Sequence, residues 1–424
     1  MKILLNGGLI PTENGFKKVD IAIENDTIID ISSKINSSFF DLILDVNNNH
    51  IFTGFTDVHV HFREPGFFYK ETIETGSKAA ARGGYTTVCT MPNLNPAPDC
   101  LDNLKIQQDI IDKTAVIEVL PYASITKGQK GEGELVDFVA LKDKCFAFSD
   151  DGRGVQAKEL MLDAMNQVQK LNKTIVAHCE DDTMLHGGYI HDGEYAKLHN
   201  HKGICSASEY SQIARDIELS RKSGCKYHIC HISTKESVEL IRKAKADGLN
   251  VTCETAPHYL VFTDMDLIED GKFKMNPPIR SKEDKQALIE GIKDGTIDVI
   301  ATDHAPHSLE EKSKGLSGSA MGIVGIETAF SVLYTYLVKE NIITMDRLID
   351  LLAINARKIF NLEENKIEVG SKANLVVIDL EKEYTINPDD FLSKGRATPF
   401  EGHKVFGEVK YTIYKGNLAW NYAE

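Results

Sequence analysis

Residues 57–66 read DVHVHFREPG, and they close an apolar run that begins at residue 51. Side chains alternate between the two faces of a strand, so His59, His61 and Arg63 share one face, with Phe55 and Asp57 further back on it. Two imidazoles and a guanidinium at a strand end are the groups that bind a metal ion and an anion. Taken alone, the histidine pair fits a structural role as well as a metal site, and the choice between them depends on the rest of the chain.

The same pattern recurs along the chain, where short apolar runs rich in β-branched residues alternate with helical stretches. The runs expected to form strands cover residues 51–61, 85–93, 115–124, 145–152, 174–182, 226–234, 250–259 and 298–307. Helical periodicity is found at 76–83, 158–171, 206–224, 234–248 and 282–295. Eight strand-and-helix units over roughly 250 residues predict an α/β fold, specifically a (β/α)8 TIM-like barrel.

The two ends of the chain have a different pattern, with short alternating strands and turns. Examples are VDIAIEN at 19–25 and KYTIYKG at 410–416. Each end alone is too small to bury a core, so we expect the two to combine in one small β-sandwich. The predicted domains are the N-terminal part of the sandwich at 1–52, the catalytic barrel at 53–360 and the C-terminal part of the sandwich at 361–424.

Composition and charge narrow the class of protein. The 424 residues include 42% hydrophobic and 26% charged residues, which is ordinary for a soluble protein. The formal net charge is −15, and the scattered lysines and arginines argue against a nucleic-acid or anionic-membrane surface. The eight cysteines form no CxxC pair, and no run has the length of a secretory apolar core or a membrane span. We therefore expect a cytoplasmic protein with reduced thiols.

Metal-binding side chains follow the predicted strands at their C-terminal ends, where a barrel of this kind builds its active site. They are His59, His61, Asp150 or Asp151, His178, His231 and Asp303. Four imidazoles and two carboxylates are too many for one tetrahedral zinc ion, and they suit two metal ions ~3.5–4 Å apart with a bridging carboxylate. Strand parity leaves Asp150 and Asp151 equally suited to bridge. Such a centre makes a water nucleophilic, and an adjacent aspartate can accept its proton.

Other polar residues fall near the same ends. Asn93 closes the second run, Asn276 and His258 follow the seventh, and His304 and His307 follow Asp303. His258 and His304 fit either a supporting or a packing role. The polar loop holds His186, His191, His199 and His201, for which we expect no catalytic role. The glycine-rich stretch at 314–325 lacks a phosphate-loop pattern and is expected to be a flexible active-site loop.

These segments resemble dihydroorotases of the type I bacterial class, in the amidohydrolase superfamily. DVHVHFREPG is similar to the family's first signature, and ATDHAPHSLEEK at 301–312 to its second. AFSDDG, IVAHCEDD, HICHISTKES, KMNPPIR and GIVGIETA also resemble family segments and occur in the family's order. The resemblance covers nearly the whole chain.

The resemblance implies one or two zinc ions per subunit, with two favoured. Asp303 is implied to be both a ligand and the catalytic acid–base, and Asp151 to take the bridging place that a carboxylated lysine fills in many amidohydrolases. Lys142 and Lys144 precede the strand and are not expected to bridge. The implied metal ligands are His59, His61, Asp151, His178, His231 and Asp303. The implied substrate contacts are Arg63, Asn93, Asn276, His307, Met321 and Gly322. Met321 stands where the family often has phenylalanine, so a backbone contact is expected there.

The reaction implied is the reversible cyclisation of N-carbamoyl-L-aspartate to L-dihydroorotate in pyrimidine biosynthesis. A homodimer and an association with aspartate transcarbamoylase are implied as partners. One alternative is another cyclic-amide hydrolase, such as a hydantoinase or allantoinase, although these typically carry the bridging lysine. A second alternative is a non-catalytic partner of aspartate transcarbamoylase, which is expected to have lost its metal ligands.

Overall fold

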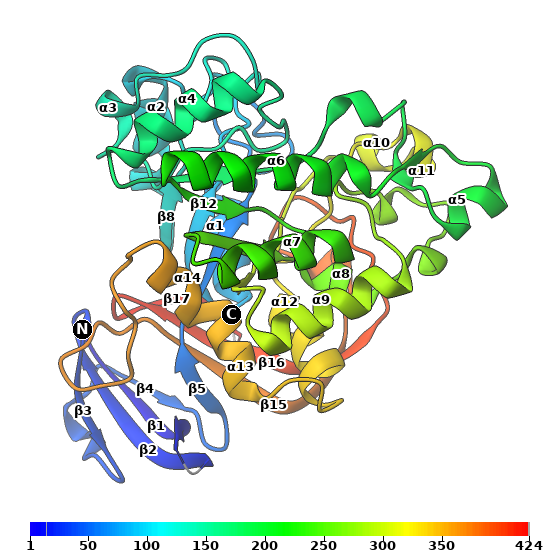
Figure 1. Cartoon of the computed structure of the whole chain (residues 1–424). Coiled ribbons are helices and arrows are strands. Elements are labelled where there is room, and N and C mark those ends of the chain that lie inside the picture. Colours follow the sequence, from blue (N-terminus) through cyan, green and yellow to red (C-terminus); the bar gives the residue numbers. More distant parts are fainter. Residues whose placement is uncertain (14, 423–424) are drawn as a thin grey trace.

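The computed structural model describes residues 1–13 and 15–422. A mixed sheet is built from the two ends of the chain, and the middle of the chain forms parallel strands that alternate with helices (Figure 1). The protein is therefore an α/β protein, as its pattern of runs predicts.

Both ends of the chain contribute to one sheet, with strand order β17-β16-β15-β5-β1-β2-β3 and β4 paired with β1. The two ends meet where β5 pairs with β15 in antiparallel register, with Thr53 opposite Leu375. Ile3, Ile21 and Ile413 belong to one buried cluster, which joins strands from both ends in a common core. The strands are β1 (Lys2–Thr12), β2 (Gly15–Glu24), β3 (Thr27–Ser32), β4 (Leu42–Asp45), β5 (His50–Thr53), β15 (Leu375–Thr385), β16 (Lys404–Tyr414) and β17 (Asn417–Asn421).

The two larger parallel sheets in the middle of the chain have orders β6-β7-β8 and β14-β13-β12-β9, and β10 (Ile190–His191) pairs with β11 (Gly203–Ile204) apart from them. Single parallel bridges link the two larger sheets, through Phe148 to Ala123 and Ile175 on one side and from Val60 to His304 on the other. Because the pairings are parallel, the C-terminal ends of these strands face the same way. The strands are β6 (Phe55–Val60), β7 (Tyr85–Thr90), β8 (Glu118–Pro121), β9 (Thr174–Ala177), β12 (Lys226–Ile229), β13 (Val251–Thr255) and β14 (Val299–Ile300).

Residues 145–152, expected as a full strand, form bridges with their neighbours only at Phe148, although Phe146 and Ser149 also donate backbone hydrogen bonds to the preceding strand segment. The strand is therefore shorter than expected. The cause is the carboxylate of Asp150, two residues after Phe148. Asp150 accepts hydrogen bonds from the backbone N–H groups of Ile125, Thr126 and Gly131, which holds the chain in a turn after Phe148. Residues 145–152 still lie between β8 and β9, and Asp151 lies just beyond the ends of these strands.

Helices surround the parallel strands (Figure 1), and the five predicted ones are present. Thr72, Thr234 and Ser281 cap three of them, each accepting a hydrogen bond from a backbone N–H three residues later. The predicted helices are α1 (Ile73–Arg82), α4 (Lys158–Gln169), α6 (Ala207–Ser223), α7 (Lys235–Ala246) and α9 (Lys282–Asp294). Those not predicted include α2 (Leu101–Thr114), α8 (Pro257–Val261), α10 (Leu309–Lys312), α11 (Gly315–Gly318), α12 (Ala329–Leu333), α13 (Met345–Ile349) and α14 (Asn355–Ile359).

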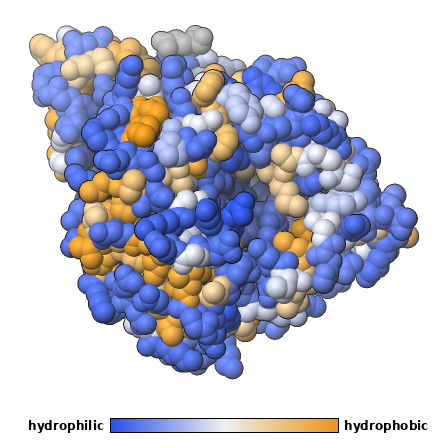
Figure 2. Space-filling model, turned by 90° about the horizontal axis from the view of Figure 1, so that it is seen from above, coloured by the Kyte–Doolittle hydropathy of each residue, from blue (hydrophilic) through white to orange (hydrophobic). Residues whose placement is uncertain are grey.

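The surface is mostly polar. Figure 2 shows one face on which hydrophilic side chains predominate and border a central hollow, with hydrophobic patches toward one side. Among the residues that the structure describes, no helix combines the length and the apolar character needed to cross a membrane.

Candidate metal and substrate site

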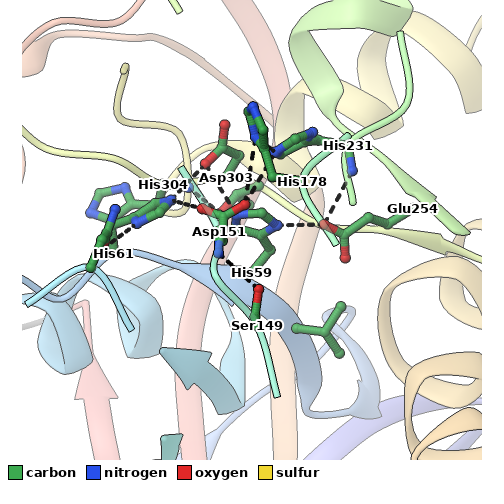
Figure 3. Close-up of polar contacts among 12 residues, drawn as sticks. His59, His61, Ser149, Asp151, His178, His231, Glu254, Asp303 and His304 are labelled. Carbon is green, nitrogen blue, oxygen red and sulfur yellow. Dashed lines mark hydrogen bonds and ion pairs between the residues drawn. The ribbon is translucent and has the colours of Figure 1, made fainter. Parts of the chain in front are cut away.

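The predicted metal ligands meet at the C-terminal ends of the parallel strands, around the carboxylate of Asp151 (Figure 3). One oxygen, Oδ2, lies 3.4 Å from Nε2 of both His59 and His61. The other, Oδ1, lies 3.4 Å from Nε2 of His231 and 3.7 Å from Nδ1 of His178. A single carboxylate therefore stands between two pairs of imidazoles. All of these side chains are buried.

Asp303 joins the cluster from the segment after β14. Its Oδ1 lies 3.0 Å from Nε2 of His61 and 3.5 Å from Nε2 of His59. Burial raises the pKa of this carboxyl, but the hydrogen bond from His61 and the charge of His59 outweigh burial and hold the pKa below its ordinary value. Asp303 is therefore ionised at neutral pH and able to accept a proton.

The structure distinguishes the two aspartates that strand parity leaves equivalent. The carboxylate of Asp150 accepts hydrogen bonds from backbone N–H groups and from the Thr126 hydroxyl, so Asp150 stabilises the turn. Asp151 faces the imidazoles. Burial raises its pKa, and the charge of His59 together with the nearby imidazoles of His231 and His61 reverses that effect and lowers the pKa well below its ordinary value.

Several atoms of the cluster lack a hydrogen-bond partner among the described residues. They include the buried Nε2 of His59 and Oδ1 of Asp151. Two groups of three residues bring their ligand atoms within 4.8 Å of one another: His59, His61 and Asp151, and Asp151, His178 and His231. Imidazole nitrogen and carboxylate oxygen are the donors that zinc prefers. Buried ligand atoms that lack a hydrogen-bond partner fit a metal centre better than a self-contained hydrogen-bond network.

Glu254, on β13, is a supporting residue that the sequence did not reveal. Its carboxylate lies 2.6 Å from Nδ1 of His59 and 3.1 Å from Nε2 of His228, and it accepts a hydrogen bond from the backbone N–H of His231. A hydrogen bond on one ring nitrogen orients the other, so Glu254 directs Nε2 of His59 toward Asp151. Its ligand atom also groups with those of His59 and Cys230. The only sequence signal was an acid inside the apolar run VTCET.

The predicted substrate contacts line the same cavity as the cluster. The cavity has a volume of about 240 Å³ and is bordered by His61, Arg63, Asn93, Asp151, His178, His231, Asn276, Asp303, His307, Met321 and Gly322. Arg63 is buried, and its Nε donates to the carbonyl oxygen of Pro306. Oδ1 of Asn93 lies 2.9 Å from Nδ1 of His61, and the backbone carbonyl of Met321 accepts from Nε2 of His307. Lys142 and Lys144 do not line this cavity.

The histidines for which no catalytic role was expected lie outside the cluster. His191 contacts Arg280, and His201 lies beside Tyr189 and Glu269. His304 supports the site through its backbone, since its carbonyl accepts a hydrogen bond from the N–H of His61. His258 is buried, its Nε2 has no partner among the described residues, and burial lowers its pKa to about 4.

Comparison with known structures agrees with the α/β fold. L-hydantoinase (dihydropyrimidinase) from Arthrobacter aurescens superposes with a TM-score of 0.87 at 22% identity, covering 99% of this chain and 96% of that one. D-hydantoinase from Thermus sp. gives a TM-score of 0.85 at 24% identity, over 100% and 96%. At these identities the comparison shows the fold, which this chain shares with both enzymes.

Sequence comparison narrows the class to one family. A family model described as "Dihydro-orotase-like" matches residues 49–237. A curated protein named dihydroorotase from Fusobacterium nucleatum subsp. nucleatum is 51% identical over 419 residues, covering 99% of this chain and 98% of its own. One of the same name from Bacillus caldolyticus is 49% identical over 423 residues, covering 99% of both. The chain belongs to the dihydroorotase family, whose members hydrolyse a cyclic amide.

Proposed function

We propose that this chain is a zinc-dependent dihydroorotase that reversibly closes N-carbamoyl-L-aspartate to L-dihydroorotate, with loss of water, in cytoplasmic pyrimidine biosynthesis. The observation that carries the proposal is a single cavity that joins the cluster around Asp151 to the guanidinium of Arg63. The open-chain substrate has two carboxylates, of which one reacts and one does not. A metal centre suits the first, and a planar cation suits the second.

The metal is proposed to be zinc, with two ions per subunit. His59, His61 and Asp303 would hold one ion and His178 and His231 the other, with Asp151 shared between them. The positions of the two Asp151 oxygens, each near a different pair of imidazoles, support this division. When bound, the zinc supplies a Lewis acid for the reacting carbonyl and makes a water nucleophilic at neutral pH.

The protein's own groups move the proton and hold the substrate. In the hydrolytic direction, Asp303 accepts a proton from the attacking water and passes it to the leaving ring nitrogen. In ring closure, a proton from solution first converts the reacting carboxylate to a carboxylic acid. Asp303 then takes the proton from the ureido nitrogen and gives it to the departing hydroxyl, which leaves as water. Arg63, Asn93 and His307 hold the carboxylate that does not react, while Asn276 and the backbone at Met321–Gly322 contact the ring.

Arg63 is well prepared for this role. Burial lowers its pKa to about 10, which still leaves the guanidinium charged at neutral pH. Nε is bonded to Pro306 and Nη2 lies 3.4 Å from Nε2 of His307, so the guanidinium is held beside His307, with Nη1 and Nη2 as the planar fork that would face a carboxylate. A local cation of this kind lets a chain with net charge −15 bind an anion.

The finer architecture is part of the same proposal. The bridges of Phe148 and of Val60 with His304 support one closed (β/α)8 barrel over residues 53–360. The shared sheet of the two ends supports a small sandwich formed by residues 1–52 and 361–424. The proposal retains the homodimer and the association with aspartate transcarbamoylase as predictions, which sedimentation of the chain alone and with that enzyme would test.

A direct comparison of substrates tests the function against its nearest rivals. The chain, with zinc measured on the same sample, should hydrolyse dihydroorotate and show little turnover of hydantoin or allantoin, which lack the ring carboxylate that Arg63 would bind. Preference for hydantoin or allantoin would replace the proposed function with that of another cyclic-amide hydrolase. Zinc binding without turnover of any of the three would favour a non-catalytic partner.

A further inference from the structure

The side-chain amide of Asn276 has a fixed orientation. Its Nδ2 lies 3.0 Å from both carboxylate oxygens of Glu180, which follows β9 two residues after His178. An ionised carboxylate has no hydrogen to donate, so the end of the amide that faces Glu180 must be the NH2 group. The chemistry of the pair therefore decides which way the Asn276 amide points, and the carbonyl end must point away from Glu180.

The carbonyl end of Asn276 is left without a partner. Its Oδ1 is buried and accepts no hydrogen bond from any described residue, although Asn276 lines the cavity that holds the cluster. Leaving a buried acceptor unpaired is unfavourable, because the oxygen has lost its water without gaining a donor. A ligand that brings an N–H to this oxygen removes that cost, whereas a ligand that brings a carbonyl or an ether oxygen does not.

Glu180 is itself held firmly. Its backbone N–H donates to Oε1 of Gln212, and its carbonyl accepts from the side-chain amides of Gln212 and Gln156. Two glutamines thus fix the chain on either side of the carboxylate. The carboxylate also lies 3.7 Å from Nε2 of His178, so a test at Glu180 has to monitor the metal separately.

We propose that Glu180 is a positioning residue that locks the Asn276 amide so that its carbonyl accepts a hydrogen bond from a ring N–H of the substrate. The inference rests on the proposed function and adds a determinant of specificity to it. Dihydroorotate has two ring N–H groups, and the one that meets Asn276 becomes a required donor. The site then selects a cyclic amide by the hydrogen it donates as well as by its carboxylate.

The test measures how strongly the enzyme discriminates between dihydroorotate and its two N-methyl derivatives. We compare kcat/KM for the three compounds in the wild type, Glu180→Gln, Asn276→Ala and Asp182→Asn, with zinc content and zinc affinity measured for each protein. Asp182 is an exposed acid of the same segment and serves as the matched control. Glu180→Ala also frees the Asn276 amide and is used if Glu180→Gln does not fold.

The wild type should disfavour one methylated compound by about tenfold or more, as expected for the loss of a hydrogen bond to a buried acceptor. The discrimination that remains in Asn276→Ala measures steric effects alone. In Glu180→Gln the discrimination should fall most of the way to the Asn276→Ala value at unchanged zinc affinity, because the glutamine amide can accept or donate and lets the Asn276 amide rotate. In Asp182→Asn the discrimination should equal that of the wild type.

Three results would overturn the inference: wild-type discrimination in Glu180→Gln, wild-type discrimination in Asn276→Ala, or a loss in Glu180→Gln that excess zinc reverses. A wild type that does not turn over dihydroorotate would instead refute the proposed function on which the inference rests.

Discussion

The carboxylate of Asp57 on β6 accepts hydrogen bonds from the hydroxyl of Thr302, at 2.6 Å, and from its backbone N–H. This contact joins the first parallel strand to the segment that leads into Asp303. Asp57 also lies two residues before His59, whose backbone N–H donates to the same carboxylate. One buried acid therefore sets the spacing between two proposed ligands that are far apart in sequence.

Asp57→Ala should lower the free energy of unfolding by about 2–4 kcal/mol, because it leaves three buried donors unpaired. Burial raises the pKa of Asp57 to about 7, so a neutral group suits this position. Asp57→Asn, which keeps an acceptor oxygen, should therefore cost less than Asp57→Ala. Urea unfolding of the zinc-loaded proteins measures both, and equal losses for the two variants would show that the acceptor is unimportant.

Arg63→Lys should raise KM for dihydroorotate about tenfold or more while zinc content stays unchanged. Lysine keeps the positive charge but lacks the planar fork that matches a carboxylate. Steady-state kinetics measure the effect. An unchanged KM would mean that the carboxylate is held elsewhere.

Lys312 pins the loop that borders the cavity. Its buried ammonium donates to the carbonyl oxygens of Lys274, Ala320 and Gly322. Lys312→Met would remove the side-chain donor to the carbonyl oxygens of Ala320 and Gly322, while the carbonyl of Lys274 would keep the backbone N–H of Gly322. We therefore expect a higher KM and faster proteolytic cleavage within residues 308–322. Lys314→Met changes an exposed lysine of the same loop and is the control. Equal cleavage rates in the two variants would contradict the role of Lys312.

Asp303→Asn should reduce turnover to near background while zinc remains bound by the histidines. The amide keeps the shape of the side chain but cannot shuttle a proton at neutral pH. Turnover and zinc content are measured on one preparation. Substantial activity in this variant would assign the proton transfer to another group.

The direction of the reaction should depend on pH. Ring closure consumes one proton, because a carboxylate dianion becomes a monoanion and water. The equilibrium ratio of dihydroorotate to carbamoyl-aspartate should therefore fall about tenfold for each unit of rising pH, by the usual proton linkage. Chromatography of the equilibrated mixture at two pH values checks this, and a ratio independent of pH would contradict the proton balance.

The sequence predicts the α/β fold, and places the candidate ligands at strand ends, for a physical reason. Strand alternation and the position of each run's end are local properties, so His59, His61, His178, His231 and Asp303 could be assigned to strand ends without knowing the packing. The resemblance to a family added the role of Asp151. In the structure these residues come together around the Asp151 carboxylate.

Features that depend on distant partners were not predictable in this way. Glu254 acts on His59, which is 195 residues away, and the Glu180–Asn276 pair spans 96 residues. The apolar run around Glu254 indicates burial, but nothing local shows which side chain either acid supports. The early end of the strand around Phe148 was also not predictable, because the composition of residues 145–152 is typical of a strand and the hydrogen bonds of Asp150 interrupt it.

Zinc titration of the metal-free chain tests the central claim most directly. Zinc is removed with a chelator and returned in steps, while cyclisation of carbamoyl-aspartate and bound zinc per subunit are measured together. We expect no cyclisation without metal and activity that rises with zinc to a limit of two ions per subunit. Full cyclisation by the metal-free chain, or zinc binding that leaves the chain inactive, would contradict this expectation.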